Sequence, residues 1–265
     1  MIRSGQSTNP WVFNARQYTE ARLRLFCFPY AGGGASVYAP WVGALAPTIE
    51  VYPVQLPGRE NRLKEKPYLQ FDELIQALVL ALSPLFTKPF AFFGHSMGAL
   101  ISFGLTQQLL KQGHPLPEHL FLSAYRAPQI PNDESLRTLS DAALMRKVLG
   151  MNGTQPQIFE NAEIRQFLLP LMRADFSVCE TYVHAASEPL ERPITVFGGL
   201  QDNRAIKATV EPWSEQTCKA FRICMLPGDH FFWRNAPQPL LQLIKQELQP
   251  YLVNTVREKG EQAGV

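Results

Sequence analysis

The chain has 265 residues, of which 46% are hydrophobic and 18% are charged, a composition typical of a globular protein that buries one large core without disulfides or metal. Its formal net charge of +2 is too small to indicate a nucleic acid or an anionic membrane surface as its partner. The length predicts a single domain. We place it in the cytoplasm, because we find no apolar run long enough to span a membrane, no secretory signal and no Cys-x-x-Cys motif.

The first strand of a sheet is predicted over residues 22–28, which become continuously apolar toward Phe28. It is followed by Pro29-Tyr30-Ala31-Gly32-Gly33-Gly34. A run of glycines is often only a flexible connector. After a strand it also lets backbone N–H groups turn toward an anion, so we predict the N–H of Ala31 as one donor of an oxyanion hole.

A second strand, over residues 49–55, ends at Leu56-Pro57-Gly58-Arg59. Basic side chains cluster here, diluted by two glutamates. Most such clusters are solvated loops, and the alternative hypothesis is a docking edge for an acidic partner. The basic residues are Arg59, Arg62, Lys64 and Lys66. A helix that covers one face of the sheet is predicted to follow, over residues 71–86.

The stretch Gly94-His95-Ser96-Met97-Gly98 lies between an apolar strand at 89–93 and a helical pattern at 97–110. This context raises the Gly-x-Ser-x-Gly pattern above chance, because a serine at a sharp strand-to-helix turn projects its hydroxyl from the sheet edge. We predict that Ser96 is the nucleophile, with strained backbone angles. The N–H of Met97, at the positive end of the helix, is the second predicted oxyanion donor.

The alternation of strands and helices stops after a strand at 119–124. About sixty residues with helical spacing follow, which is far longer than an ordinary connection. We predict a single domain over 1–265, with a core at about 21–127 and 189–253 and a helical cap at about 128–188. The apolar residues of the cap pack among its own helices or form an acyl-chain groove.

Two further strands, at 193–197 and 221–226, lead into Gly198-Gly199-Leu200-Gln201-Asp202 and Gly228-Asp229-His230. A serine hydroxyl needs an adjacent base, and a histidine base needs a carboxylate that fixes its tautomer. The order Ser96, Asp202, His230 is the α/β-hydrolase order, and all three follow strands. We therefore predict an α/β-hydrolase fold with a mostly parallel central sheet flanked by helices, and a closing helix at 236–251.

Four other histidines compete with His230 for the role of the base, and Asp229 competes with Asp202. His95 adjoins the serine and is poorly placed as its base, so it is interpreted as a surface or packing residue. The same interpretation applies to His114, His119 and His184. Asp229 is interpreted as a turn residue, because a neighbour in sequence is a strained partner for His230.

The sequence motifs around these residues together resemble those of the type II thioesterases, the stand-alone editing enzymes of non-ribosomal peptide and polyketide synthases. They are also similar to the medium-chain thioesterase of animal fatty acid synthase. The first twenty residues and the C-terminal tail lie outside the resemblance. The matching pieces are Phe28-Pro29-Tyr30-Ala31-Gly32-Gly33, Leu56-Pro57-Gly58-Arg59, Gly94-His95-Ser96-Met97-Gly98-Ala99, Leu171-Met172-Arg173-Ala174-Asp175-Phe176, Gly198-Gly199-Leu200-Gln201-Asp202 and Gly228-Asp229-His230-Phe231-Phe232.

The resemblance implies a serine hydrolase that cleaves acyl or aminoacyl thioesters through an acyl-enzyme. Its task would be editing or release in non-ribosomal peptide, polyketide or fatty acid biosynthesis, including the synthesis of antibiotics or siderophores. It implies carrier-protein domains as partners, with the substrate on their phosphopantetheine arm and no cofactor or metal in the enzyme itself. We expect a monomer. The alternatives are a general α/β-hydrolase esterase, an acyltransferase, or a non-catalytic binding protein with the same fold.

Overall fold

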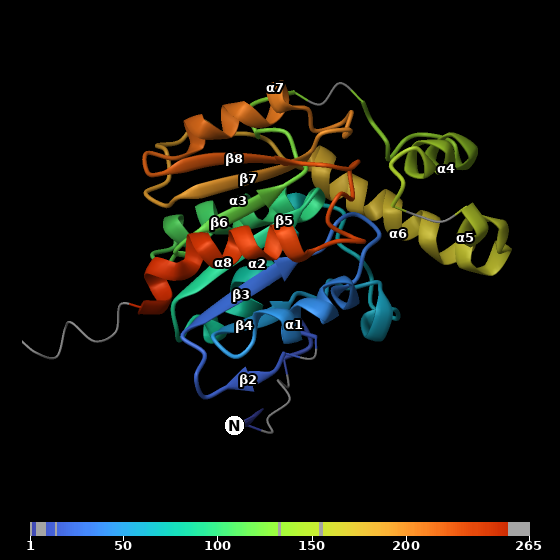
Figure 1. Ribbon diagram of the computed structural model, residues 1–265. Helices are drawn as coiled ribbons and strands as arrows, with labels where there is room; N and C mark the ends of the chain where they lie inside the picture. Colours follow the sequence, from blue (N-terminus) through green and yellow to red (C-terminus); the bar gives the residue numbers. More distant parts are fainter. Residues whose placement is uncertain (1, 4–8, 14, 132–133, 154–155, 254–265) are drawn as a thin grey trace, which may run out of the picture.

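The computed structural model describes residues 2–3, 9–13, 15–131, 134–153 and 156–253. Six parallel strands form the central sheet in the order β4-β3-β5-β6-β7-β8 (Figure 1). The α/β-hydrolase prediction is confirmed by this sheet and by the structural relatives given below. The strands are β3 (Leu23–Phe28), β4 (Ile49–Pro53), β5 (Phe90–His95), β6 (Leu120–Ser123), β7 (Ile194–Gly199) and β8 (Phe221–Leu226). A separate antiparallel pair, absent from the sequence-based prediction, joins β1 (Ile2–Arg3) to β2 (Gln17–Tyr18).

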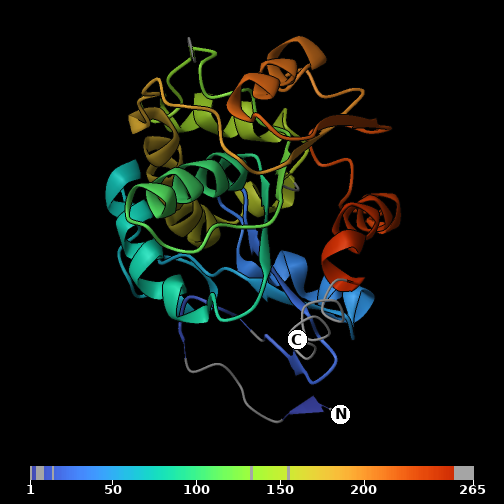
Figure 2. The same cartoon turned by 90° about the vertical axis from the view of Figure 1, so that its left-hand side faces the viewer.

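Helices cover both faces of the sheet (Figures 1 and 2). On one face, α1 (Ala39–Leu45) and α8 (Gln238–Val253) pack against Leu23 and Leu25 of β3. On the other face, α2 (Phe71–Leu82) and α3 (Met97–Lys111) pack against Phe26 of the same strand. Because alternate residues of a strand point to opposite faces, β3 supplies both core layers with the apolar residues Leu23, Leu25 and Phe26.

The predicted elements fit the observed ones to within a few residues, with one informative difference. The helix expected over 71–86 ends as an α-helix at Leu82 and continues as a 3₁₀ turn over Ser83–Leu85. Pro84 explains the change, because it has no N–H with which to continue the helical hydrogen bonds. The other short helices are α7 (Lys207–Val210) and the 3₁₀ turns Ala35–Tyr38, Glu60–Arg62 and Glu211–Gln216.

In the described part of the chain between β6 and β7, three helices lie toward the carboxyl edge of the sheet, at the right of Figure 1. We call α4 (Asp141–Leu149), α5 (Pro156–Glu160) and α6 (Ala162–Thr181) the insertion. They share a small apolar cluster of their own, in which Val148 and Phe159 pack with Met172 of α6. Val178, less than two turns farther along α6, packs instead into the main core with α2 and α3. α6 therefore bridges the insertion and the sheet domain.

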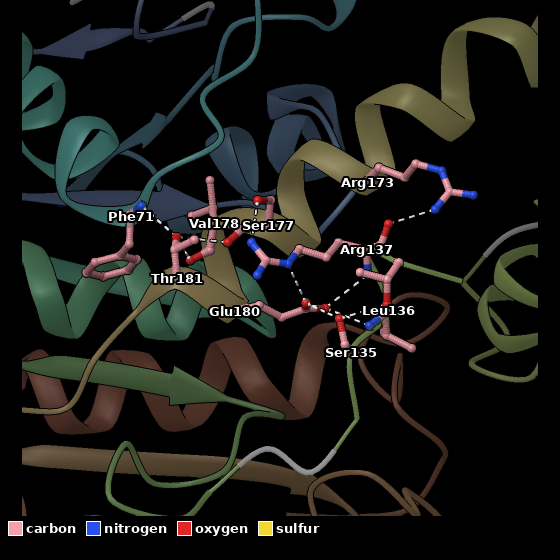
Figure 3. Close-up of polar contacts among 10 residues, drawn as sticks. Phe71, Ser135, Leu136, Arg137, Arg173, Ser177, Val178, Glu180 and Thr181 are labelled. Carbon is pink, nitrogen blue, oxygen red and sulfur yellow. Dashed lines mark hydrogen bonds and ion pairs between the residues drawn. The ribbon is translucent and has the colours of Figure 1, made fainter. Parts of the chain in front are cut away.

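The C-terminal part of α6 is fixed to its surroundings by hydrogen bonds (Figure 3). Thr181 Oγ1 accepts the N–H of Phe71 at 3.0 Å, where α2 begins. The carboxylate of Glu180 accepts the N–H groups of Leu136 at 2.6 Å and Arg137 at 3.1 Å. These contacts hold α6 both to the core and to the chain that leaves β6. No helix in the described part of the chain is both long and apolar enough to cross a bilayer.

Candidate active site

Ser96 occupies the turn between β5 and α3, and its backbone is strained as predicted, with φ 54° and ψ −120°. Its N–H is held by the carbonyl of Ser123 on the neighbouring strand β6, at 2.7 Å. The flanking glycines are required by close backbone approach. A Cβ on Gly94 would lie 2.0 Å from the carbonyl oxygen of Gly98, and a Cβ on Gly98 would lie 2.1 Å from that of Phe28. The turn therefore has room for Ser96 only because both neighbours lack a side chain.

The glycine run after β3 forms a tight turn beside Ser96. The N–H of Gly33 donates to the carbonyl of Tyr30 at 2.9 Å, and Gly32 has the positive φ of 77° that a type II turn needs at this position. The N–H of Gly32 donates to Asp175 Oδ2 at 2.7 Å. Ala31, at the second position of the turn, lines a cavity together with Ser96. Met97 is the first residue of α3, where an N–H has no acceptor within the helix.

His230 and Asp202 are brought together by the loops that follow β8 and β7. Their Nδ1 and Oδ2 atoms lie 2.8 Å apart, and both residues are at least 95% buried. The other carboxylate oxygen, Oδ1, accepts the N–H groups of Arg204 at 2.9 Å and Ala205 at 3.4 Å. The aspartate is therefore held from its own loop and from the histidine at once.

The charge of Asp202 determines which ring nitrogen of His230 carries the shared proton. Burial acts to raise the pKa of the Asp202 carboxyl, but the hydrogen bond and charge interaction with His230, with the N–H groups of its loop, hold that pKa below its usual value. An ionised carboxylate only accepts hydrogen bonds, so Nδ1 of His230 carries the shared proton. In the neutral ring, Nε2 is then a free acceptor.

Asp229, the alternative partner of His230, has a local role. Its Oδ1 accepts the N–H of Phe231 at 2.8 Å. This hydrogen bond from the backbone two residues later forms an Asx-turn. Its Oδ2 accepts from the side-chain amide of Asn152 at 3.0 Å. The structure therefore supports the interpretation of Asp229 as a turn residue.

His95 is a fully buried packing residue beside the site. Trp233 Nε1 donates to its Nδ1 at 3.1 Å, and the Ser123 hydroxyl lies 2.9 Å from the same nitrogen. Its ring centroid lies 5.2 Å from that of His230. Burial, and then the nearby His230, lower the pKa of His95 well below 6.5, so it stays neutral. His119 is also buried and bonds Thr195, His184 lies near Tyr182, and His114 follows the end of α3.

The basic cluster at 59–66 is not the surface patch that the sequence suggested. Arg59 is buried against Asp175, and Arg62 is buried, with its guanidinium 4.2 Å from the ring centre of Trp11. Only Lys64 and Lys66 are exposed. The prediction of a solvated or docking surface is wrong for both arginines, because each has a partner inside the fold that a local charge pattern does not reveal.

Ser96, His230 and Ala31 line one cavity of about 30 Å³, which holds only one or two water molecules. Its other walls are largely apolar, and the insertion supplies Val148 and Met172 among them. Among the residues that the structure describes, no group of three or more histidine, cysteine, aspartate or glutamate side chains is arranged to hold a metal ion.

A serine on a strained strand-to-helix turn, with a buried His–Asp pair on two later loops of one parallel sheet, is the arrangement typical of the α/β-hydrolase class. The model of the thioesterase domain family matches residues 23–248, so the chain belongs to the thioesterase family and is a thioester hydrolase. This confirms the family resemblance predicted from the motifs.

Three relatives illustrate the match. The gramicidin S biosynthesis protein GrsT of Aneurinibacillus migulanus is 43% identical over 241 residues, which cover 91% of this chain and 94% of GrsT. The RedJ thioesterase from the prodiginine pathway of Streptomyces coelicolor is 40% identical, with a TM-score of 0.82, over 86% of this chain and 91% of RedJ. The type II thioesterase BorB from the borrelidin biosynthetic cluster is 33% identical, with a TM-score of 0.84, over 92% of this chain and 100% of BorB.

Sequence reasoning assigned no role in the site to Arg59 or Asp175. One signal was present. Leu168, Leu171, Met172 and Asp175 follow helical spacing, which places the aspartate on the apolar stripe of α6. A carboxylate on such a stripe is buried only with a partner, so its position was a signal of a buried cation that the sequence-based prediction did not use.

Proposed function

We propose that Ser96, His230 and Asp202 are a catalytic triad, and that the N–H groups of Ala31 and Met97 form its oxyanion hole. The observation that carries this proposal is the 2.8 Å hydrogen bond of His230 to a buried, ionised Asp202 at the cavity that Ser96 lines. The membership of the thioesterase family supports it.

In the proposed reaction, His230 Nε2 takes the proton of Ser96 Oγ as the oxygen attacks the thioester carbonyl. The electron pair of the carbonyl moves to its oxygen, where the N–H groups of Ala31 and Met97 stabilise the charge. Collapse of this intermediate breaks the C–S bond, and the thiol leaves with the proton from His230. Water, deprotonated by His230, then attacks the acyl-enzyme, the bond from the acyl carbon to Ser96 Oγ breaks, and Oγ takes the proton back from His230 as the acid is released.

We infer that the substrate is an acyl or aminoacyl group on the phosphopantetheine arm of a carrier protein. GrsT and BorB come from gramicidin S and borrelidin biosynthesis, and BorB is named a type II thioesterase. The task is then editing or release within non-ribosomal peptide or polyketide synthesis. The phosphopantetheine belongs to the carrier, so the enzyme needs no cofactor of its own.

We further propose that residues 128–188 act as a cap over the core formed by 21–127 and 189–253. The cavity of about 30 Å³ leaves little room beside Ser96, so we infer that its walls move apart when a long acyl chain enters. Because the C-terminal part of α6 is fixed to α2, the movement belongs to α4 and α5. We place the protein in the cytoplasm as a monomer, where its four unpaired cysteines stay reduced.

The test uses an acetyl group loaded on a purified peptidyl carrier domain, with free acid measured by mass spectrometry. Wild type should release acetate, whereas Ser96→Ala and His230→Ala should be inactive but folded by circular dichroism. If wild type cleaves only oxygen esters, the carrier thioester is not its substrate. Transfer of the acetyl group to a second carrier thiol without release of acid would identify an acyltransferase, and no reaction at all would identify a binding protein.

A further inference from the structure

A buried ion pair outside the triad contacts the glycine turn. Arg59 and Asp175 form two hydrogen bonds, Nη1 to Oδ2 at 2.8 Å and Nη2 to Oδ1 at 2.7 Å, and both side chains are only 4% exposed. Arg59 follows β4, whereas Asp175 lies 116 residues later on α6. A buried pair of this kind contributes little net stability, because desolvation of the two charges offsets their attraction. Its presence beside the glycine turn therefore calls for another explanation.

Both members of the pair hold the turn that carries Ala31. Asp175 Oδ2 accepts the N–H of Gly32 at 2.7 Å, and Arg59 Nη1 donates to the carbonyl of Gly33 at 3.0 Å. The N–H of Gly32 belongs to the central peptide of the turn, which is the unit that flips between alternative turn types. Asp175 therefore fixes the Ala31–Gly32 peptide, directly after Ala31, and Arg59 fixes the Gly33–Gly34 peptide at the end of the turn.

The turn needs this external support. Consecutive glycines have more backbone freedom than any other sequence, so the turn does not define its own conformation. Stabilisation of an oxyanion requires donors within about 0.2 Å of their best position, because they act through preorganised geometry. Asp175 itself is held rigidly, since α6 is bonded to α2 and to residues 135–137 (Figure 3).

We propose that Asp175 and Arg59 are positioning residues that orient the N–H of Ala31 toward the developing oxyanion. The inference rests on the proposed function of Ser96 and of the oxyanion hole. It also means that the predicted cap helix α6 contributes to transition-state stabilisation, in addition to lining the cavity.

The expected loss follows from the value of one donor. Removal of a whole oxyanion-hole donor reduces kcat by about 10²–10³-fold. A donor that is present but less well oriented stabilises the oxyanion less, so Asp175→Asn should reduce kcat by roughly 10–100-fold. KM should change by less than about threefold, because the interaction strengthens only in the transition state.

The chain offers a matched control in Glu50. It forms another buried ion pair, with Arg24 at 2.9 Å, and the two side chains are 1% and 9% exposed. This pair lies where β3 and β4 begin, at the opposite edge of the sheet from Ser96. Glu50→Gln makes the same acid-to-amide change as Asp175→Asn. It therefore measures how much thermal stability and activity are lost when a buried ion pair far from the site is broken.

The experiment compares wild type, Asp175→Asn and Glu50→Gln on the acetyl-carrier substrate and with two inhibitors. One is a trifluoromethyl ketone analogue of acetyl-pantetheine. Ser96 Oγ adds to its carbonyl carbon, the proton moves to His230, and the carbonyl oxygen becomes an anion in the oxyanion hole. The other is the thioether analogue, which binds without forming an anion. Thermal unfolding is measured for every variant.

Asp175→Asn should weaken the ketone by the same factor as kcat and leave the thioether affinity unchanged, whereas Glu50→Gln should change only thermal stability. The inference is overturned if the kcat of Asp175→Asn falls no further than that of Glu50→Gln, or if the whole loss appears in KM. If Asp175→Asn does not fold, Arg59→Lys replaces it, with an expected three- to tenfold loss of kcat and ketone affinity; equal loss of thioether affinity would refute the inference. An inactive wild type or an active Ser96→Ala would refute the proposed function instead.

Discussion

Replacement of Asp202 by asparagine reverses the hydrogen-bonding character of the group that faces His230. In the wild type, Oδ1 accepts two backbone N–H groups of the 204–205 segment while Oδ2 accepts from Nδ1 of the imidazole. Asparagine has only one oxygen, and the two N–H groups retain it. The amide NH₂ must then face Nδ1 of His230, which can accept only if its proton moves to Nε2. The ring nitrogen that should deprotonate Ser96 then carries a proton.

The magnitude of this change is that of a base held in the wrong tautomer. Such a substitution in a serine–histidine–aspartate triad lowers kcat by about 10⁴-fold, so we expect a loss of roughly 10³–10⁴-fold for Asp202→Asn, or about 4–5.5 kcal/mol. Stability should suffer far less, since the asparagine retains the two backbone hydrogen bonds and nearly the same shape. The variant should therefore be folded and almost inactive.

Asp229→Asn is the matched control, because Asp229 adjoins His230 in sequence but bonds Phe231 and Asn152 instead. We expect its activity to stay within about threefold of wild type, since it loses at most one partly exposed hydrogen bond. The assay is single-turnover release of acetate from the loaded carrier domain, with enzyme in excess. An Asp202→Asn enzyme within tenfold of wild type, or an Asp229→Asn enzyme as slow as Asp202→Asn, would show that another group orients the imidazole.

Three further predictions follow from other parts of the structure. Gly98→Ala places a Cβ 2.1 Å from a backbone oxygen and should slow labelling of the serine by a fluorophosphonate at least about 100-fold, whereas Gly43→Ala, which meets no atom within 4 Å, should label normally. Burial lowers the pKa of His119 to about 4, so the folded state does not take up the proton that the unfolded state binds below pH 6.5. The free energy of unfolding should thus fall by about 2 kcal/mol more from pH 7 to pH 5 in wild type than in His119→Gln, measured with urea. Charge reversal of Lys64 and Lys66 should raise KM for the carrier-bound substrate but not for the N-acetylcysteamine thioester, and equal effects on both would exclude docking there.

Much of the fold, and the position of the candidate site residues on the sheet, could be predicted because both depend on local patterns. The core strands are short and mostly apolar, and turn residues or helical patterns separate them, so their order along the chain can be read directly. In a parallel sheet all carboxyl ends meet at one edge. Three residues that each follow a strand, Ser96, Asp202 and His230, are therefore expected at the same edge without knowledge of any contact.

The parts that sequence reasoning missed depend on contacts between distant segments. Arg62 is buried by the indole of Trp11 and by the carbonyl of Gln55, which its Nη1 contacts at 2.9 Å. A charge pattern assigns such arginines to the surface, because burial of a charge is costly unless a partner is present. The size of the cavity was also beyond prediction, since it is set by side-chain packing between the insertion and the core.

The glycine turn shows why composition misjudges rigidity. In isolation its glycines suggest a flexible connector, yet a Cβ on Gly32 would lie 2.9 Å from the side chain of Met172, and one on Gly34 would lie 2.0 Å from the carboxylate of Glu60. The missing side chains leave space that α6 and the 59–60 segment fill. The freedom that glycine has in the unfolded chain is thus removed by neighbours in the folded one. The residues that decide how firmly the turn is held are then those neighbours, and substitutions at Asp175 or Glu60 should perturb the N–H of Ala31 although neither adjoins it in sequence.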